Sequence, residues 1–284
     1  MSLNGLFGPL NPPIKEWRDQ RVWLVGASSG IGAALARELA RRGARIAVSA
    51  RREQSLHDVL DEVGGGPDQR PDQRPDQRPD QRPFDALVLP LDVTNAGALA
   101  AARDAIVAAW GGVDVVIWLA ALWVPMRADN FDLAAARRTI EINQIGALNL
   151  LAAVLPVLLD QGRGQLVLTA SVAGWGGMPK ALAYGQTKAA LNHLAETLWI
   201  DLNPRGIGVA VVNPGFVDTP ATATNTFTMP ALISADEAAL RILAGISAGE
   251  FNIHFPRRFT GVLKFLRLLP IRCWFAVIRR TTGL

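Results

Sequence analysis

Short apolar runs alternate with longer amphipathic segments along most of the chain. The apolar runs are typical of buried strands and lie at residues 22–25, 45–49, 87–91, 114–119, 165–170, 207–212 and 251–255. The segments between them have the composition and apolar spacing of helices and lie at residues 31–42, 53–63, 96–110, 132–159, 181–203 and 236–246. This alternation predicts an α/β protein with a parallel, doubly wound sheet. Such a sheet binds its ligand at the carboxyl ends of the strands.

The turn after the first predicted strand consists almost entirely of small residues. It reads Gly26-Ala-Ser-Ser-Gly30-Ile-Gly32 and leads directly into a predicted helix. Glycine lets a phosphate or a neighbouring backbone come close, and the free N–H groups at the start of a helix attract an anion. The spacing G-x-x-x-G-x-G differs from the general dinucleotide fingerprint G-x-G-x-x-G. We interpret the turn as a phosphate site, with an ordinary tight turn as the alternative.

Arg51 follows the second predicted strand, where a dinucleotide-binding fold faces the adenosine ribose. An acid at this place accepts a hydrogen bond from the 2′-hydroxyl, whereas an arginine suits a 2′-phosphate. The neighbours of Arg51 are Ala50 and Arg52, so no acid stands beside it. The sequence therefore predicts that NADP(H) is preferred over NAD(H). The alternative is a solvated arginine at the start of a helix.

Tyr184 is the only tyrosine of the chain, and Lys188 follows it by four residues. In a helix the two side chains share a face. A nearby ammonium favours the phenolate, so we expect the pKa of Tyr184 to fall from about 10 toward the range useful in acid–base catalysis. Ser171, after the fifth predicted strand, can hydrogen bond to the same oxygen. The tyrosine–lysine pair is a weak signal alone, but together with Ser171 and the glycine turn it indicates a catalytic site.

With these motifs the chain resembles the short-chain dehydrogenase/reductase family over about residues 18–256. Further matching pieces are Asp92-Val93, Asn143 in the helix before the serine strand, and Pro214-Gly215. The resemblance implies a single Rossmann-type domain with a seven-stranded parallel sheet. It also implies an NAD(P)-dependent oxidoreductase that transfers a hydride between the nicotinamide and a small-molecule carbonyl or alcohol.

The resemblance implies roles for individual residues as well. Tyr184 would be the general acid/base, and Ser171 would orient the reacting oxygen. Lys188 would hold the nicotinamide ribose and assist the tyrosine, while Asn143 would support a water of a proton relay. Asp92 and Val93 would contact the adenine. The full set of implied cofactor contacts is Gly26, Ser28, Ser29, Gly30, Ile31, Gly32, Arg51, Asp92, Val93, Ala120, Tyr184, Lys188, Pro214, Gly215, Val217 and Thr219.

One position departs from the family pattern. The family usually carries Asn-Asn-Ala-Gly after the fourth strand, where this chain has Trp118-Leu119-Ala120-Ala121. Leu119 fills space but cannot make the hydrogen bonds of an asparagine side chain. This change leaves a non-catalytic NAD(P)-binding sensor as the alternative function. Such a sensor would not need Ser171, Tyr184 and Lys188 together, so the enzyme is the favoured interpretation.

Composition excludes several other classes of protein. A single cysteine, Cys273, allows no internal disulfide and suits a reducing compartment. No signal peptide is recognisable, which predicts a cytoplasmic protein. The net charge of +4 arises from seven Lys or Arg and no acid after Phe251, while the rest of the chain has 22 basic and 25 acidic residues. This distribution argues against a nucleic-acid face. The three histidines lack partners at ligand spacing, so no metal is expected.

The chain divides into an N-terminal extension (1–17), the predicted Rossmann-type domain (18–256) and a basic amphipathic helical tail (257–284). Residues 67–82 are four copies of Pro-Asp-Gln-Arg, which we interpret as a disordered loop. Pro270 is expected to divide the tail into two short helices. Three arrangements of the tail remain open: it caps the substrate cleft, packs in a homo-oligomer, or lies on an anionic bilayer. The last would place the protein at the inner face of the membrane and suggests a lipid-like substrate.

Overall fold

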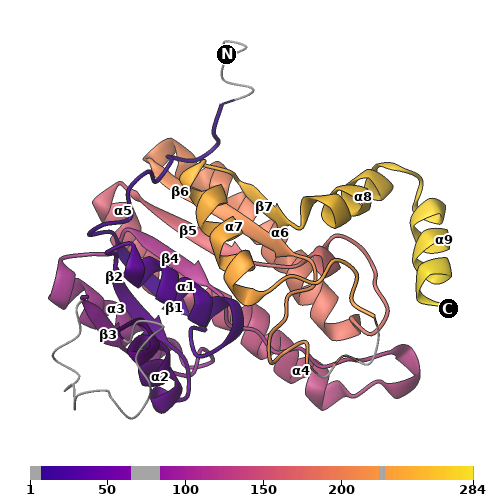
Figure 1. The fold of residues 1–284 in the computed structure, drawn as a ribbon, viewed down its shortest axis with the longest axis horizontal. Coiled ribbons are helices and arrows are strands. Elements are labelled where there is room, and N and C mark those ends of the chain that lie inside the picture. The colour runs from indigo at the N-terminus through magenta and orange to yellow at the C-terminus, as the bar shows by residue number, and fades with distance from the viewer. Residues whose placement is uncertain (1–7, 65–83, 224, 226–227, 284) are drawn as a thin grey trace.

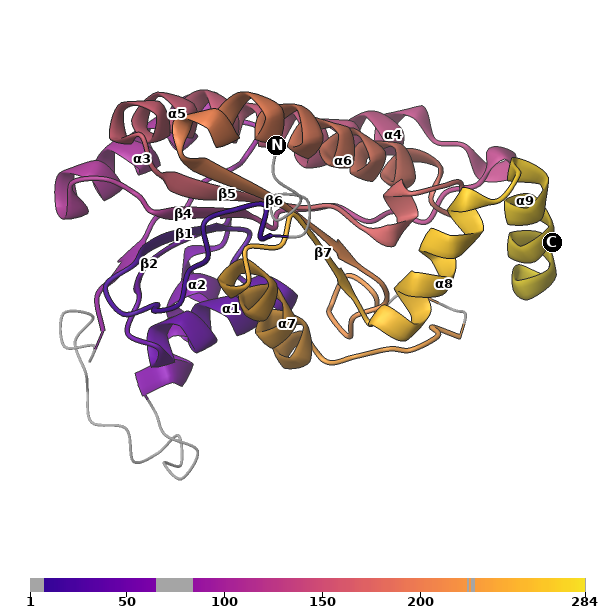
Figure 2. The ribbon, with the colours of Figure 1, turned by 90° about the horizontal axis from the view of Figure 1, so that it is seen from above.

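The computed structural model describes residues 8–64, 84–223, 225 and 228–283, which form one parallel sheet between two layers of helices (Figures 1 and 2). Within this part of the chain the sheet has seven strands in the order β3-β2-β1-β4-β5-β6-β7. The strands are β1 (Arg21–Val25), β2 (Arg45–Ser49), β3 (Ala86–Val88), β4 (Val115–Trp118), β5 (Gly164–Thr169), β6 (Ile207–Pro214) and β7 (Asn252–Phe255). The predicted doubly wound sheet is confirmed.

Helices cover both faces of the sheet, as Figure 2 shows from above. One layer contains α1 (Gly30–Arg41), α2 (Glu53–Gly64) and α7 (Ala235–Ser247). The other contains α3 (Ala96–Trp110), α5 (Gly146–Gln161) and α6 (Leu182–Leu202), with α4 (Leu133–Ile140) beside α6. Along β1, Val22 and Leu24 enter one core and Trp23 and Val25 the other. A strand buried on both faces reads as a continuous apolar run, which is why the sequence pattern predicted the strands.

Two predicted elements differ in extent from the observed ones. The third strand was expected at 87–91 but β3 ends at Val88. Leu89 and Leu91 still donate to Val48 O and Ala50 O, but Pro90 between them has no N–H and interrupts the ladder. The long helix expected at 132–159 is divided into α4 and α5 by a π-helical turn at Glu141–Ile145. π-Turns of this kind are frequently found at functional sites.

The stretch Leu133–Gln161 is long and apolar enough to cross a membrane by length and composition alone. In the structure its α5 part packs on the sheet and against α3, with Leu150, Val154 and Leu158 in the core between them. Core helices of globular proteins also pass such a test, so we interpret this stretch as a core helix.

The basic tail forms two helices, α8 (Arg257–Leu268) and α9 (Ile271–Thr282), that project beyond β7 (Figure 2). Pro270 lies between them, as predicted. At the other end of the chain, the Asn11 side chain hydrogen bonds to both Val209 N and Val209 O, which fixes residues near the start of the described part on β6. The Pro-Asp-Gln-Arg repeat at 67–82 lies outside the described residues.

Candidate active site

The glycine turn lies at the carboxyl end of β1 and requires its glycines. Gly26 has φ 104° and donates to Ser49 O at 2.7 Å. A methyl group on Gly26 would come within 2.5 Å of Ala120 N, and one on Gly32 would overlap the carbonyl oxygen of Gly26. Ser29 directly precedes α1, and its side chain makes no capping hydrogen bond to the N–H groups of the first turn. This backbone cradle fits a phosphate group.

A cleft of about 1390 Å³ extends from the glycine turn across the carboxyl ends of the strands. Ser171, Tyr184 and Lys188 line it from β5 and α6. It is also lined by every cofactor contact that the sequence predicted: Gly26, Ser28, Ser29, Gly30, Ile31, Gly32, Arg51, Asp92, Val93, Ala120, Tyr184, Lys188, Pro214, Gly215, Val217 and Thr219. The structure therefore brings residues that are distant in the sequence to one cleft.

Tyr184 and Lys188 lie one turn apart near the start of α6, as their spacing predicted. Lys188 Nζ donates to Thr169 O at 2.7 Å and lies 5.4 Å from the centre of the Tyr184 ring. Ser171 follows β5, and its hydroxyl both hydrogen bonds to the Tyr184 side chain and accepts from Ala173 N. The serine and the tyrosine are thus joined by a hydrogen bond near the carboxyl end of β5.

The expected lowering of the Tyr184 pKa is wrong for this arrangement. Burial raises the pKa of Tyr184 to about 12, and the hydrogen bond with Ser171 lowers it only in part. Burial also lowers the pKa of Lys188 to about 7. The lysine is directed at the carbonyl oxygen of Thr169, and its charged form is itself disfavoured by desolvation. The phenol is therefore held in its protonated, proton-donating form at neutral pH.

Asn143 lies in the π-helical turn and is fully buried behind the cleft. Its Oδ1 accepts from Leu122 N at 2.6 Å, and its Nδ2 donates to Leu122 O at 3.0 Å and to Thr187 Oγ1 at 3.2 Å. Thr187 in turn donates to the carbonyl oxygen of Tyr184. The asparagine thereby connects the loop after β4 to the helix that carries Tyr184 and Lys188. Its role with a water stays a prediction.

The loop after β4 keeps its backbone contacts although Leu119 stands where the family usually has an asparagine. Leu119 N and Ala120 N both donate to Val25 O, at 2.8 and 2.9 Å. The Leu119 side chain is half-buried and packs against the core under α1 and α7. The connection between β4 and β1 is thus made by the main chain.

Trp123 is a cleft residue that the sequence analysis did not single out. Its ring meets that of Tyr184 edge to face, with centres 4.9 Å apart, and its Nε1 donates to Asn225 Oδ1 at 3.1 Å. No spacing rule relates Trp123 to Tyr184, because the contact depends on how the loop after β4 folds over α6.

The tail forms one wall of the cleft. This agrees with the arrangement in which the tail caps the substrate cleft. Its cleft-lining side chains are Phe259, Val262, Leu263, Leu266, Val277, Ile278, Thr281 and Thr282. Trp274 fixes α9 in this position: it is fully buried, and its Nε1 donates to Gly177 O at 3.1 Å. A methyl group on Gly176 would come within 2.7 Å of the indole ring. We call α8 and α9 together the lid.

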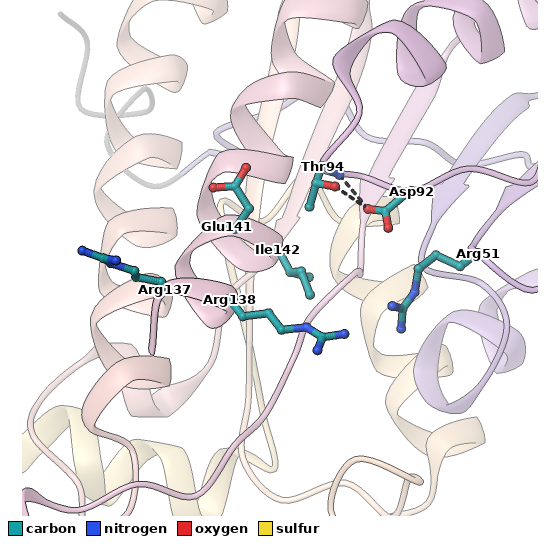
Figure 3. A pocket seen from close by; sticks show the side chains of 7 residues that line it. All are labelled: Arg51, Asp92, Thr94, Arg137, Arg138, Glu141 and Ile142. Atoms are coloured by element: carbon teal, nitrogen blue, oxygen red, sulfur yellow. Dashed lines mark hydrogen bonds between the residues drawn. The ribbon is translucent and has the colours of Figure 1, made fainter. Parts of the chain in front are cut away.

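A second, smaller pocket of about 380 Å³ adjoins the cleft (Figure 3). It is lined by Arg51, Asp92, Thr94, Arg137, Arg138, Glu141 and Ile142. Thr94 donates to Asp92 Oδ1 through both its N–H and its hydroxyl, at 2.9 and 2.8 Å. These bonds, and the charges of Arg51 and Arg138, hold the pKa of Asp92 below its usual value. Among the described residues, no group of three His, Cys, Asp or Glu side chains could hold a metal ion.

The doubly wound sheet, the glycine cradle and the Ser–Tyr–Lys cluster define a dinucleotide-dependent oxidoreductase. A model of the family described as short chain dehydrogenase matches residues 20–229, and the chain belongs to this family. It is an NAD(P)-dependent oxidoreductase of the short-chain dehydrogenase/reductase type.

Two relatives illustrate the similarity to known sequences. A protein from Myxococcus xanthus described as an uncharacterized oxidoreductase is 34% identical over 257 residues, which cover 90% of this chain and 95% of that protein. The 11-beta-hydroxysteroid dehydrogenase A of Sesamum indicum is 31% identical over 204 residues, which cover 71% of this chain and 53% of that protein.

Solved structures share the fold. A short chain dehydrogenase from Burkholderia cenocepacia in complex with NADP superposes with a TM-score of 0.75 at 24% identity, over 93% of this chain and 98% of that one. A short-chain dehydrogenase from Sphingobium yanoikuyae in complex with NADPH gives 0.71 at 26% identity, over 86% and 92% of the two chains.

Proposed function

We propose that the protein is an NADP(H)-dependent reductase or dehydrogenase that acts on an apolar, lipid-like carbonyl or alcohol. The observation that carries this proposal is one cleft that joins the glycine cradle, the Ser171–Tyr184 hydrogen bond and the apolar wall of the lid. The cradle suits the pyrophosphate of a dinucleotide because it is a tight backbone turn at the start of a helix, and a Cβ at Gly26 or Gly32 would collide with the backbone that forms it. The bound nicotinamide supplies or accepts the hydride.

In the reduction direction Tyr184 donates its proton to the carbonyl oxygen of the substrate. Its raised pKa keeps the phenol protonated until the oxygen becomes basic as the hydride arrives. Ser171 donates a hydrogen bond to the same oxygen and orients it. Lys188 Nζ is held by Thr169 O at 5.4 Å from the centre of the Tyr184 ring, where it would hold the nicotinamide ribose and assist the tyrosine. Asn143 holds the backbone of Leu122 and, through Thr187, the start of α6.

The walls of the cleft beyond the catalytic cluster support an apolar substrate. Trp123 packs edge to face against Tyr184. Further apolar surface comes from Met178 and from the lid residues Phe259, Leu263 and Leu266. Burying such surface against a hydrocarbon chain gains about 25 cal/mol per Å². A long apolar carbonyl therefore gains more from this cleft than a short or charged one.

The direct test is turnover by the purified full-length chain. NADPH is incubated with a series of aldehydes and ketones of increasing chain length, and nicotinamide absorbance is followed. Consumption of NADPH with kcat/KM rising along the series supports the proposal. Tight NADPH binding without turnover of any member would instead favour a cofactor-binding sensor.

Cofactor preference is expected to depend on Arg51, which lines the cleft at the end of β2. Arg51→Asp places a carboxylate where a 2′-phosphate would lie, so NADPH should bind about tenfold more weakly or worse, while NADH binding is retained. Dissociation constants for both nucleotides, measured by calorimetry, check this. Equal NADPH affinity in the two proteins would contradict the role of Arg51.

We further propose that the outer face of the lid rests on an anionic bilayer, with the protein in the cytoplasm. We define the outer face of the lid by its exposed apolar residues Phe265, Leu268 and Phe275, which are 61%, 83% and 54% exposed. Arg258, Arg272, Arg279 and Arg280 are exposed on the same two helices, which contain no acidic residue. Apolar side chains flanked by cations and free of anions suit anionic headgroups, and a second copy of the chain would bring the same positive charge.

Vesicle binding tests whether the lid contacts an anionic bilayer or a second copy of the chain. The full chain should sediment at low salt with phosphatidylcholine vesicles containing anionic phosphatidylglycerol, and less with phosphatidylcholine alone. Leu268→Asp with Phe275→Asp should weaken this binding roughly tenfold or more. The control is Ile200→Asp, because Ile200 is 66% exposed on α6, outside the lid. A different result would favour a contact between subunits: the full-length protein would stay in the supernatant with either kind of vesicle, and analytical ultracentrifugation without lipid would show a dimer.

A further inference from the structure

The small pocket beside the cleft contains charges that the catalytic cluster does not use. Arg51, Asp92 and Ile142 line both the small pocket and the cleft, so the two spaces are continuous. The pocket lies between the carboxyl ends of β2 and β3 and the helix α4, which belongs to the same layer as α6. Its lining comprises three arginines against two carboxylates, Asp92 and Glu141. Which ligand suits the pocket therefore depends on which of these charges face its open space.

Arg138 reaches this pocket from the helix layer. Figure 3 shows its side chain extending from α4 toward Arg51, which comes from the end of β2, with Asp92 close to both. Arg137, the preceding residue, points the opposite way in the same view. Within the described ranges, no ion pair joins Arg51 or Arg138 to a carboxylate. Two guanidinium groups thus face a common space from opposite walls.

The position of this pair relative to the cradle identifies the anion. The sheet order β3-β2-β1 places the ends of these three strands side by side. A dinucleotide whose pyrophosphate lies on the glycine turn of β1 extends its adenosine across the end of β2 toward Asp92 after β3. A phosphate on the adenosine ribose would then lie between the two arginines. Its oxygens suit guanidinium forks, which bind phosphate through paired hydrogen bonds.

We propose that Arg138 is a second specificity-determining residue, which binds the 2′-phosphate of NADP(H) from α4 while Arg51 binds it from β2. This inference rests on the cofactor preference proposed above. It adds a residue from a different layer of the fold, so that the phosphate is held between sheet and helix. Ile142, one turn after Arg138, lies beside it in the pocket and offers an apolar contact to the adenosine.

Arg138→Gln tests the inference, with Arg137→Gln as the matched control. The two changes remove the same charge from adjacent residues, but only Arg138 extends toward Arg51. Binding of NADPH, NADH and 2′,5′-ADP to the full chain is measured by calorimetry, with inorganic phosphate as a fourth ligand. We expect Arg138→Gln to weaken NADPH and 2′,5′-ADP about tenfold and NADH less than twofold. Arg137→Gln should leave all of these affinities within twofold, and Arg138→Lys should restore part of the loss.

The possible negative results differ in which proposal they contradict. If wild-type protein prefers NADPH and Arg138→Gln binds it equally well, the role of Arg138 is overturned while the proposed cofactor preference stands. Equal weakening of NADPH and NADH would overturn it too, because the loss would then not depend on the 2′-phosphate. Wild-type protein that binds NADH as tightly as NADPH would overturn both proposals. Inorganic phosphate that binds as tightly as 2′,5′-ADP would show a free-anion site and also overturn the assignment to NADP(H).

Discussion

Tyr184→Phe is expected to lower kcat at least about a hundredfold, because a positioned general acid contributes roughly 10²–10⁴-fold. The change removes the only phenol of the chain. The ring remains and keeps its edge-to-face contact with Trp123, at 4.9 Å between centres. The cleft should therefore hold its shape, and the dissociation constant of NADPH should stay within about twofold.

The measurement pairs steady-state kinetics with calorimetry on the same preparations. Ser171→Ala is a useful comparison, since it removes the hydrogen bond to the phenol but leaves the proton donor. It should reduce kcat less than Tyr184→Phe does. A Tyr184→Phe protein that keeps more than about a tenth of the wild-type rate would show that another group supplies the proton.

The sheet and the location of the site could be predicted from the sequence because both depend on local patterns. A strand buried on both faces is an apolar run wherever it lies, as in β1 and β6. The glycine turn and the tyrosine–lysine pair are likewise short-range patterns with a geometric reason for their spacing. Parallel strands then bring their carboxyl ends to one edge, so the motifs meet in a single cleft without further information.

The features that sequence reasoning missed depend on tertiary packing. The pKa of Tyr184 was expected to fall, but its value is decided by desolvation, and no spacing rule reports how deeply a phenol is buried. The apolar spacing of residues 132–159 predicted one continuous helix and gave no signal for the π-helical turn around Asn143. Arg138 has no motif of its own, because only the docking of α4 places it opposite Arg51. The amphipathic pattern of the tail left three arrangements open, and the hydrogen bond from Trp274 to Gly177 O, which holds α9 beside the cleft, has no signal in that pattern.

Trp274→Ala is expected to release the lid and to raise KM for long apolar substrates about tenfold or more. The indole is fully buried between the lid and the loop that follows Ser171, and it donates to Gly177 O at 3.1 Å. Removing a buried tryptophan side chain costs about 3–5 kcal/mol. Trp274 belongs to a small cluster with Val172 and Leu263 that is separate from the two cores of the sheet. The loss should therefore detach α9 locally and leave the sheet folded.

Three readouts distinguish a detached lid from a general loss of stability. Limited trypsin digestion should cut Trp274→Ala faster at the lid arginines, while the melting temperature of the main transition changes little. The kcat/KM for long aldehydes should fall more than for short ones, because a longer chain buries more of its surface against the apolar wall that Leu263 and Leu266 of the lid supply. Phe275→Ala is the matched control: Phe275 is the next residue, is 54% exposed and lies outside the cleft lining, so its loss should leave soluble turnover unchanged. Equal kinetics and equal digestion of the Trp274→Ala and wild-type proteins would mean that the lid is held by contacts other than this indole, and that its apolar wall does not depend on α9.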